Sequence, residues 1–195
     1  MPSVAKVYTR TGDNGTTGLL FGGRARKDSA QIEANGAIDE AQAAIGVARA
    51  EATRASELDG ILVQVERDLW VLMAEVATAP ANRHKLVSGS SLVTAEMVDS
   101  LERLIDDVSE RFEVAKEFVV PGQARLPALL DQARTVVRRA ERLVVAAPPA
   151  DDSLAARYLN RLSDLMWTLA RWQEGEHLLA RDAGKRQPPA RRTGS

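Results

Sequence analysis

Apolar residues recur at spacings of three and four over most of the chain after residue 28, and this spacing predicts helices rather than strands. The clearest stripe covers residues 58–76 and stops at the loop around Pro80. Comparable stripes predict four more helices: one that Asp28 or Ser29 caps and that runs to about residue 48, one from Thr94 to about Phe112, one over 126–144, and one from Asp152 or Ser153 to as far as Ala180.

Five helices of about 20 residues, each roughly 30 Å long and joined by short connections, are the components of an antiparallel bundle. We therefore expect an all-α fold, a five-helix antiparallel bundle with an N-terminal Gly/Thr-rich loop at residues 7–28. Residues 1–182 are expected to form one helical-bundle domain. The last stretch, 183–195, mixes Gly, Pro and Arg, and we expect it to be a disordered basic tail.

The N-terminal loop is the first candidate for chemistry. In YTRTGDNGTTGLLFGGRARKD, small residues let the backbone approach a ligand, hydroxyls can face phosphate oxygens, and basic side chains supply positive charge. An ordinary β-hairpin that turns at Asn14 and Gly15, with solvated basic side chains, explains the segment equally well. It matches neither the P-loop pattern nor GxGxxG, so no standard nucleotide motif decides between the two interpretations.

The fourth predicted helix carries the second candidate, in ARTVVRRAERLVV. At about 100° per residue, Arg134, Arg138, Glu141 and Arg142 share one side while valine, leucine and alanine fill the other. A solvated surface with Glu141 paired to Arg138 or Arg142 is the ordinary explanation. One carboxylate among three arginines still leaves two positive charges unbalanced, so an anion site is the functional alternative.

The last predicted helix and the loop before the fourth helix hold weaker candidates. YLNRLSDLMWTLAR places Asn160, Arg161, Asp164 and Arg171 at helical spacings, and a polar bundle face with Arg161 and Asp164 paired is the simpler interpretation. Phe118, in EFVVPGQ, is by itself more typical of a core or loop-anchoring aromatic than of a ligand contact.

Composition removes several classes of protein. The 195 residues include no cysteine and two histidines, which excludes disulfides, a cysteine nucleophile and a three-histidine zinc site. A formal net charge of -1 offers no whole-protein field for nucleic acid or anionic lipid. No stretch approaches the roughly 20 apolar residues of a membrane helix, and no secretory signal is apparent, so a cytoplasmic protein is expected.

Together, TRTGDNGTTGLLFGGRARKD, GAIDEAQAAIG, FVVPG, ARTVVRRAER and YLNRLSDLMWTLAR, in this order, resemble the PduO-type ATP:cob(I)alamin adenosyltransferases. The resemblance spans residues 7–172, and five ordered blocks are far more specific than any one of them. It implies a five-helix bundle assembled as a homotrimer with active sites between subunits. It also implies transfer of the 5′-deoxyadenosyl group of ATP to reduced cobalamin, with triphosphate released and Mg²⁺ assisting.

The resemblance assigns roles to individual residues. The family's ATP contacts fall on Thr9, Arg10, Thr11, Gly12, Thr17, Lys27, Arg138, Arg139, Glu141, Arg142 and Asn160. Arg134 looks like the arginine that pairs with an aspartate of the neighbouring subunit, and Asp39 looks like that aspartate. Phe118 matches the aromatic that crowds the lower face of the corrin. The chain departs from the family's usual residues at Ala41, Gln42, Gln123, Val137 and Trp167. The metal ligands are not identified.

Other functions are compatible with the same sequence. A non-catalytic bundle that binds ATP or adenosylcobalamin as a sensor or delivery protein would use the same loop. A helical interaction module could use its basic tail to touch nucleic acid or a partner, although the near-neutral net charge argues against nucleic acid. As an enzyme, the chain would exchange its corrinoid with a cobalamin reductase and an adenosylcobalamin-dependent mutase.

Overall fold

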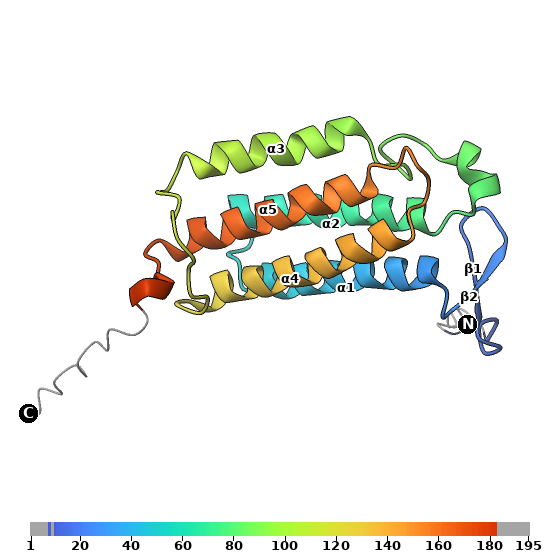
Figure 1. Cartoon of the computed structure of the whole chain (residues 1–195), viewed down its shortest axis with the longest axis horizontal. Helices are drawn as coiled ribbons and strands as arrows, with labels where there is room; N and C mark the ends of the chain where they lie inside the picture. The colour runs from blue at the N-terminus through green and yellow to red at the C-terminus, as the bar shows by residue number, and fades with distance from the viewer. Residues whose placement is uncertain (1–7, 9, 183–195) are drawn as a thin grey trace, which may run out of the picture.

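A computed structural model describes residue 8 and residues 10–182, and it confirms the bundle of five long helices (Figure 1). Thr9 and the tail at 183–195 lie outside the described residues, so the expectations about them stay predictions. The helices are α1 (Ala30–Ala50), α2 (Glu57–Val76), α3 (Ala95–Ser109), α4 (Arg125–Ala146) and α5 (Ala155–Glu174). Two strands, β1 (Thr16–Gly18) and β2 (Arg24–Arg26), and two short 3₁₀ helices, η1 (Pro80–Lys85) and η2 (Ala180–Asp182), complete the described elements.

Two helices end earlier than the sequence indicates. α5 stops at Glu174 rather than at Ala180, because Gly175 turns the chain with a φ of 72°, a conformation that glycine adopts without a steric penalty. α3 stops at Ser109 rather than at Phe112. There the Arg111 Nε donates to the Asp107 carbonyl oxygen at 3.2 Å and satisfies one of the free carbonyls of the last turn.

α4 lies at the centre of the helix packing. It contacts α1 on one side and α5 on the other, while α2 packs on α1 and α3 packs on α5. The core is mostly aliphatic, with the aromatic Tyr158 of α5 also fully buried, and its fully buried members from α4 are Leu130, Ala133, Val137 and Ala140. No helix in the described part of the chain is long and apolar enough to cross a membrane.

The N-terminal segment does form a β-hairpin, but its turn lies elsewhere than predicted. β1 and β2 pair antiparallel, so the connection is residues 19–23, where Phe21, Gly22 and Gly23 all have positive φ. Asn14 instead folds the chain before β1, since its side-chain oxygen accepts from the Thr16 N–H at 3.1 Å. The Leu20 N–H donates to the Ala77 carbonyl at 2.9 Å and attaches the hairpin to the end of α2.

The hairpin and the loop between α3 and α4 lie at opposite ends of the bundle (Figure 1). The hairpin end also holds the start of α1, the end of α2 and η1. The opposite end holds the start of α4, the end of α5 and η2. Within one chain, the glycine-rich loop and the loop that carries Phe118 are therefore separated by the length of the helices.

Each end of the bundle contains a buried charged group. Glu75 is fully buried near the hairpin end and accepts from Arg83, from the Val93 N–H at 2.9 Å and from the Ser153 hydroxyl at 2.7 Å. At the other end Arg171 is 1% exposed, and the prediction that it lies on a polar face is wrong. Its guanidinium nitrogens lie 2.5 Å from an Asp131 oxygen and 3.1 Å from a Glu174 oxygen, which compensates the cost of burying the charge.

Glu75→Ala is expected to lower the free energy of unfolding by ~3–5 kcal/mol, because it leaves three polar groups in two connections, on Arg83, Val93 and Ser153, without their buried acceptor. Urea unfolding followed by circular dichroism measures the loss. Glu96→Ala is the matched control, since Glu96 makes an exposed ion pair with Arg103 at 2.6 Å and its removal should cost less than ~1 kcal/mol. Equal losses in the two variants would contradict the role given to Glu75.

Candidate functional site

The N-terminal loop holds Lys27 against a glycine. A Cβ built on Gly12 would lie 3.1 Å from the Lys27 Nζ and 3.2 Å from the Thr16 carbonyl oxygen, so a side chain there would displace the ammonium group. The Lys27 N–H donates to the Gly15 carbonyl at 2.9 Å. Thr17 lies on β1 opposite Ala25 of β2, the strand that directly precedes Lys27, and Thr17 is half-buried. The fold of the loop therefore places the Lys27 ammonium beside the backbone at Gly12 and Thr16.

Two of the loop's basic side chains are occupied by the hairpin itself. The Arg24 Nη2 donates to the Thr11 carbonyl at 2.7 Å and to the Thr16 hydroxyl at 2.6 Å, and Arg26 pairs with Asp28 at 2.6 Å. The Arg26 guanidinium also lowers the pKa of Asp28 through its hydrogen bond. No sequence pattern indicates that Arg24 braces the hairpin instead of facing a ligand.

Arg10 and Lys27 are the other cations of the loop. Arg10 has a φ of 62°, and its guanidinium lies 5.3 Å from the centroid of the Tyr8 ring. Both side chains are exposed, and neither forms an ion pair with any described residue. They are the charges of this loop that an anion can engage.

The arginines of α4 divide into two groups. Arg138 and Arg142 are exposed, and no carboxylate among the described residues lies within 4 Å of either guanidinium. Arg139 points instead to α1, where it forms an ion pair with Glu40. Glu141 does not pair with Arg138 or Arg142 as the solvated-surface interpretation expects; its carboxylate accepts from the Asn160 side chain at 3.0 Å.

Asn160 belongs to a polar network between α3, α4 and α5. Its side-chain oxygen accepts from the Arg161 Nη1 at 2.6 Å, and the Arg161 Nε donates to Glu102 at 2.8 Å. The Arg161 hydrogen bond lowers the pKa of Glu102, so this carboxylate stays ionised and keeps Arg161 in place. Arg161 also lies 3.6 Å from Asp164, the pairing predicted from sequence. The network fixes the Asn160 amide beside the arginine face of α4.

Asp39 and Arg134 do not pair within one chain. Asp39 is exposed on α1 and has no ion-pair partner among the described residues. Arg134 is half-buried, and its Nε lies 3.5 Å from Asp131. That nitrogen is buried without a hydrogen bond within the described part of the chain. An exposed carboxylate and an incompletely satisfied guanidinium are the features that a partner subunit could complete.

Phe118 lies on the surface rather than in the core. Its residue surface is 88% exposed, so the prediction of a core or loop-anchoring aromatic is wrong. It borders a pocket of about 460 Å³ that also includes Pro121, Arg134, Trp167 and Arg171. The structure therefore brings together Phe118 and Arg134, two residues that are 16 positions apart in the chain.

The remaining candidates stay apart in a single chain. The described loop residues 12–27 form no hydrogen bond or ion pair with Arg138, Arg139 or Arg142. The described residues also contain no group of three or more His, Cys, Asp or Glu side chains placed to hold a metal ion. The chain alone thus presents two half-sites of positive charge and a separate pocket beside Phe118.

Comparisons with known proteins identify the family of the chain. The family model for cobalamin adenosyltransferase matches residues 7–173. A corrinoid adenosyltransferase of Citrobacter freundii is 40% identical over 173 residues, which are 87% of this chain and 95% of that protein. A corrinoid adenosyltransferase of Mycobacterium tuberculosis is 40% identical over 172 residues, which are 86% of this chain and 88% of that protein.

Solved structures show the same fold. A variant PduO-type ATP:corrinoid adenosyltransferase from Lactobacillus reuteri, complexed with cobalamin and ATP, superposes with a TM-score of 0.79 at 26% identity, covering 91% of this chain and 97% of that one. A second variant of that enzyme, with the same ligands, gives a TM-score of 0.80 over 90% of this chain and 99% of that one. The chain belongs to the cobalamin adenosyltransferase family and is an enzyme of the PduO-type corrinoid adenosyltransferase class.

Proposed function

We propose that this enzyme binds ATP between its N-terminal loop and α4 and transfers the 5′-deoxyadenosyl group to cobalt of cob(I)alamin, with release of triphosphate. The observation that supports it best is the pair Arg138 and Arg142, which are exposed on one side of α4 with no carboxylate near them among the described residues. Unbalanced guanidinium groups on a rigid helix suit a polyphosphate, which can accept several charge-assisted hydrogen bonds.

The ATP site is proposed to combine two copies of the chain. Within one chain the loop cations and the arginines of α4 are not joined by any described contact. In a homotrimer, the loop of one subunit, with Thr9, Arg10, Thr11, Gly12, Thr17 and Lys27, would meet Arg138, Arg139, Glu141, Arg142 and Asn160 of its neighbour. Asp39 is proposed to pair with Arg134 across the same interface, which would use the exposed carboxylate on α1.

The reaction needs little acid–base chemistry from the protein. The cobalt(I) of the substrate is itself the nucleophile: its electron pair forms the cobalt–carbon bond at C5′ as the bond between C5′ and oxygen breaks, and that electron pair leaves with triphosphate. Cobalt is thereby formally oxidised from cobalt(I) to cobalt(III). The protein has to align the two centres and stabilise the growing negative charge on the leaving group, and lysine and arginine side chains can do so.

The corrin is proposed to lie at the pocket beside Phe118. An aromatic ring exposed at the mouth of a 460 Å³ pocket can crowd the lower face of the corrin and displace its lower axial base. A cobalt(II) without that lower ligand is reduced to cobalt(I) more easily. Phe118 and Arg134 border the same pocket, so the subunit contact and the corrin site would be adjacent.

Mg²⁺ is proposed as the counter-ion of the triphosphate. Mg²⁺ commonly keeps few protein ligands beside substrate phosphates, and the described residues offer no cluster of three acidic or histidine ligands. When bound, it would supply positive charge to the leaving group. The enzyme is proposed to act in the cytoplasm and to exchange its corrinoid with a reductase and a mutase.

The decisive experiment is a spectrophotometric assay with ATP, Mg²⁺ and chemically reduced cobalamin. An absorbance change to that of adenosylcobalamin, with one triphosphate released per product, supports the enzyme. A sensor or delivery protein would bind ATP and adenosylcobalamin but release no triphosphate. Deletion of residues 183–195 tests the third possibility, a helical interaction module. Such a module would lose its function without the basic tail, whereas the enzyme would keep its activity.

Arg138→Ala is expected to lower kcat/KM roughly ten- to a hundredfold, because it removes at least one charge-assisted contact worth ~1.5–3 kcal/mol. The adenosylcobalamin assay measures this change. Arg103→Ala, on the exposed face of α3, removes an arginine of another surface and should leave kcat/KM unchanged. Near-native turnover by Arg138→Ala would take Arg138 out of the site.

Phe118→Ala is expected to keep ATP binding and to lose activity mainly when cobalt(II) has to be reduced on the enzyme. The reason is that the smaller side chain no longer crowds the lower axial base. Assays that start from cob(II)alamin and from preformed cob(I)alamin are compared. Trp70→Ala, another exposed aromatic, is the control and should change neither. Equal losses in both assays would argue against this role for Phe118.

Asp39→Ala is expected to weaken the trimer, because each interface loses one partner of a charged pair. The loss of ~1.4 kcal/mol per interface corresponds to about tenfold weaker association. Mass photometry over a dilution series measures the species present. Asp106→Ala, on the exposed side of α3, is the matched control. A trimer as stable as that of the unsubstituted chain would remove Asp39 from the interface.

A further inference from the structure

The loop that carries Phe118 has few contacts that could hold it in place. It contains no helix between the end of α3 at Ser109 and the start of α4 at Arg125. Arg111 fixes its beginning through Glu57 at 2.8 Å. Within residues 112–123, the Glu117 carboxylate, the Phe118 carbonyl and the Val120 N–H all bond to residues 178–181.

Residues 175–182, here called the C-terminal strap, pair with this loop as a short antiparallel ladder. The Ala180 N–H donates to the Phe118 carbonyl at 2.8 Å, and the Val120 N–H donates to the Leu178 carbonyl at 2.8 Å. Val119 and Leu179 form the bridge between these two bonds. The two main-chain hydrogen bonds therefore lie at Phe118 and two residues after it.

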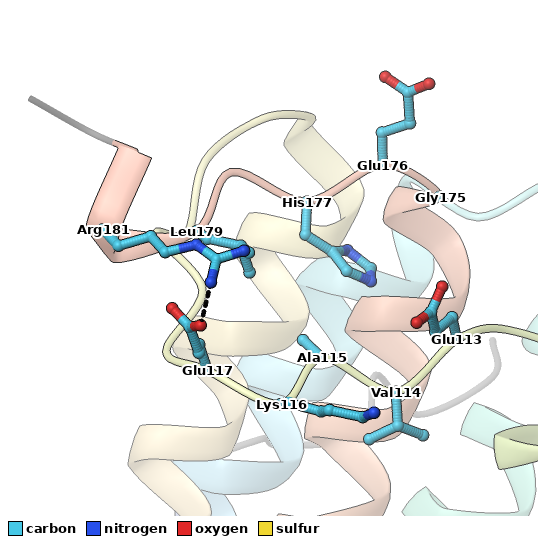
Figure 2. A pocket seen from close by; sticks show the side chains of 10 residues that line it. All are labelled: Glu113, Val114, Ala115, Lys116, Glu117, Gly175, Glu176, His177, Leu179 and Arg181. Atoms are coloured by element: carbon cyan, nitrogen blue, oxygen red, sulfur yellow. Dashed lines mark hydrogen bonds and ion pairs between the residues drawn. The ribbon is translucent and has the colours of Figure 1, made fainter. Parts of the chain in front are cut away.

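An ion pair reinforces the ladder on the other side of Phe118. The Arg181 Nη1 lies 2.5 Å from a Glu117 oxygen, and Figure 2 shows the two side chains directed toward each other from the two segments. Before Glu117 the segments separate around a cavity of about 570 Å³ that Glu113, Lys116 and His177 help to line (Figure 2). The polar contacts between strap and loop are thus concentrated at residues 117–120.

The strap is itself attached to the buried charges at the end of α5. It begins at Gly175, directly after Glu174, whose carboxylate pairs with Arg171 at 3.1 Å. The His177 Nδ1 lies 3.3 Å from the same Glu174 carboxylate, and the His177 ring meets the Phe112 ring edge-on at a centroid distance of 6.5 Å. The strap is therefore anchored at the buried Glu174, and its backbone beyond that point pairs with the loop that carries Phe118.

The exposure of Phe118 makes this support important. A side chain that is 88% exposed makes few packing contacts of its own, so its position depends on the backbone that carries it. That backbone is held by the strap on both sides of Phe118, at Glu117 and at Val120. A shift of the strap would move the ring relative to Arg134 and Trp167 in the same pocket.

We propose that the C-terminal strap is the positioning element for Phe118, and that Ala180 and Arg181 act through it as positioning residues for the displacement of the lower axial base. This rests on the proposed role of Phe118. The strap sets how far the ring projects toward the corrin, so it controls the fraction of bound cob(II)alamin that lacks its lower ligand. Binding of ATP between the loop of one subunit and α4 of its neighbour does not depend on the strap.

Ala180→Pro tests the main-chain contact. It removes the N–H that donates to Phe118, and it suits the backbone because Ala180 is the first residue of η2 and Leu179 before it is in a β-bridge. With ATP and cob(II)alamin bound, electron paramagnetic resonance should show about three- to tenfold less of the species without a lower ligand. Ala180→Gly keeps the N–H and is the matched control, and KM for ATP should not change in either variant.

A charge exchange tests the ion pair and does not depend on whether the proline variant folds. Arg181→Glu and Glu117→Arg should each reduce the same spectroscopic signal, and the double variant should restore it. Native signals in Ala180→Pro and in both single variants would overturn the proposal, and so would a double variant as impaired as the singles. Failure of the unsubstituted chain to alkylate preformed cob(I)alamin would instead contradict the proposed function.

Discussion

The packing of α4 between α1 and α5 is the constraint on which the sites depend. Its buried side consists of small and branched aliphatic residues such as Val137, Ala140 and Val144, and a helix can commit one side to the core only by turning the opposite side outward. Arg138 and Arg142 are exposed for that reason. The hydrophobic effect that folds the bundle thus also places two guanidinium groups, without either needing a carboxylate to hold it.

Buried charges fix the connections at the two ends of the bundle. Glu75 ties the end of α2 to segments that precede α3 and α5 and so supports the end that carries the hairpin. Arg171 with Asp131 and Glu174 closes the other end, from which the strap leaves. Breaking a buried pair of this kind is costly because the remaining charge stays desolvated. The hairpin and the strap, which carry or support the proposed sites, are therefore attached next to buried charged groups.

Hydrophobic periodicity was sufficient to predict all five helices, because each buries a regular stripe. Periodicity does not predict where the backbone changes direction. Gly175 ends α5, and the hairpin turns at Phe21, Gly22 and Gly23, which all have positive φ. Periodicity also placed Arg171 on a polar face, since spacing cannot reveal that Asp131 and Glu174 meet it inside the core. The motif blocks identify the family and the candidate residues. They do not reveal the contacts of Arg24 within the hairpin or the pairing of the strap with the Phe118 loop, because these contacts join segments that are distant in the sequence.

The chemistry explains why such distant contacts matter here. A substrate that brings its own nucleophile asks the protein for position and charge rather than for proton transfer, so the residues with most influence are those that hold others in place. An aromatic ring has to stay exposed to meet a ligand and cannot be fixed by burying itself. Its position must come from the backbone, and in this chain that backbone is paired with a segment rooted at Glu174. The Phe118 ring can thus stay exposed while the strap holds the backbone that carries it.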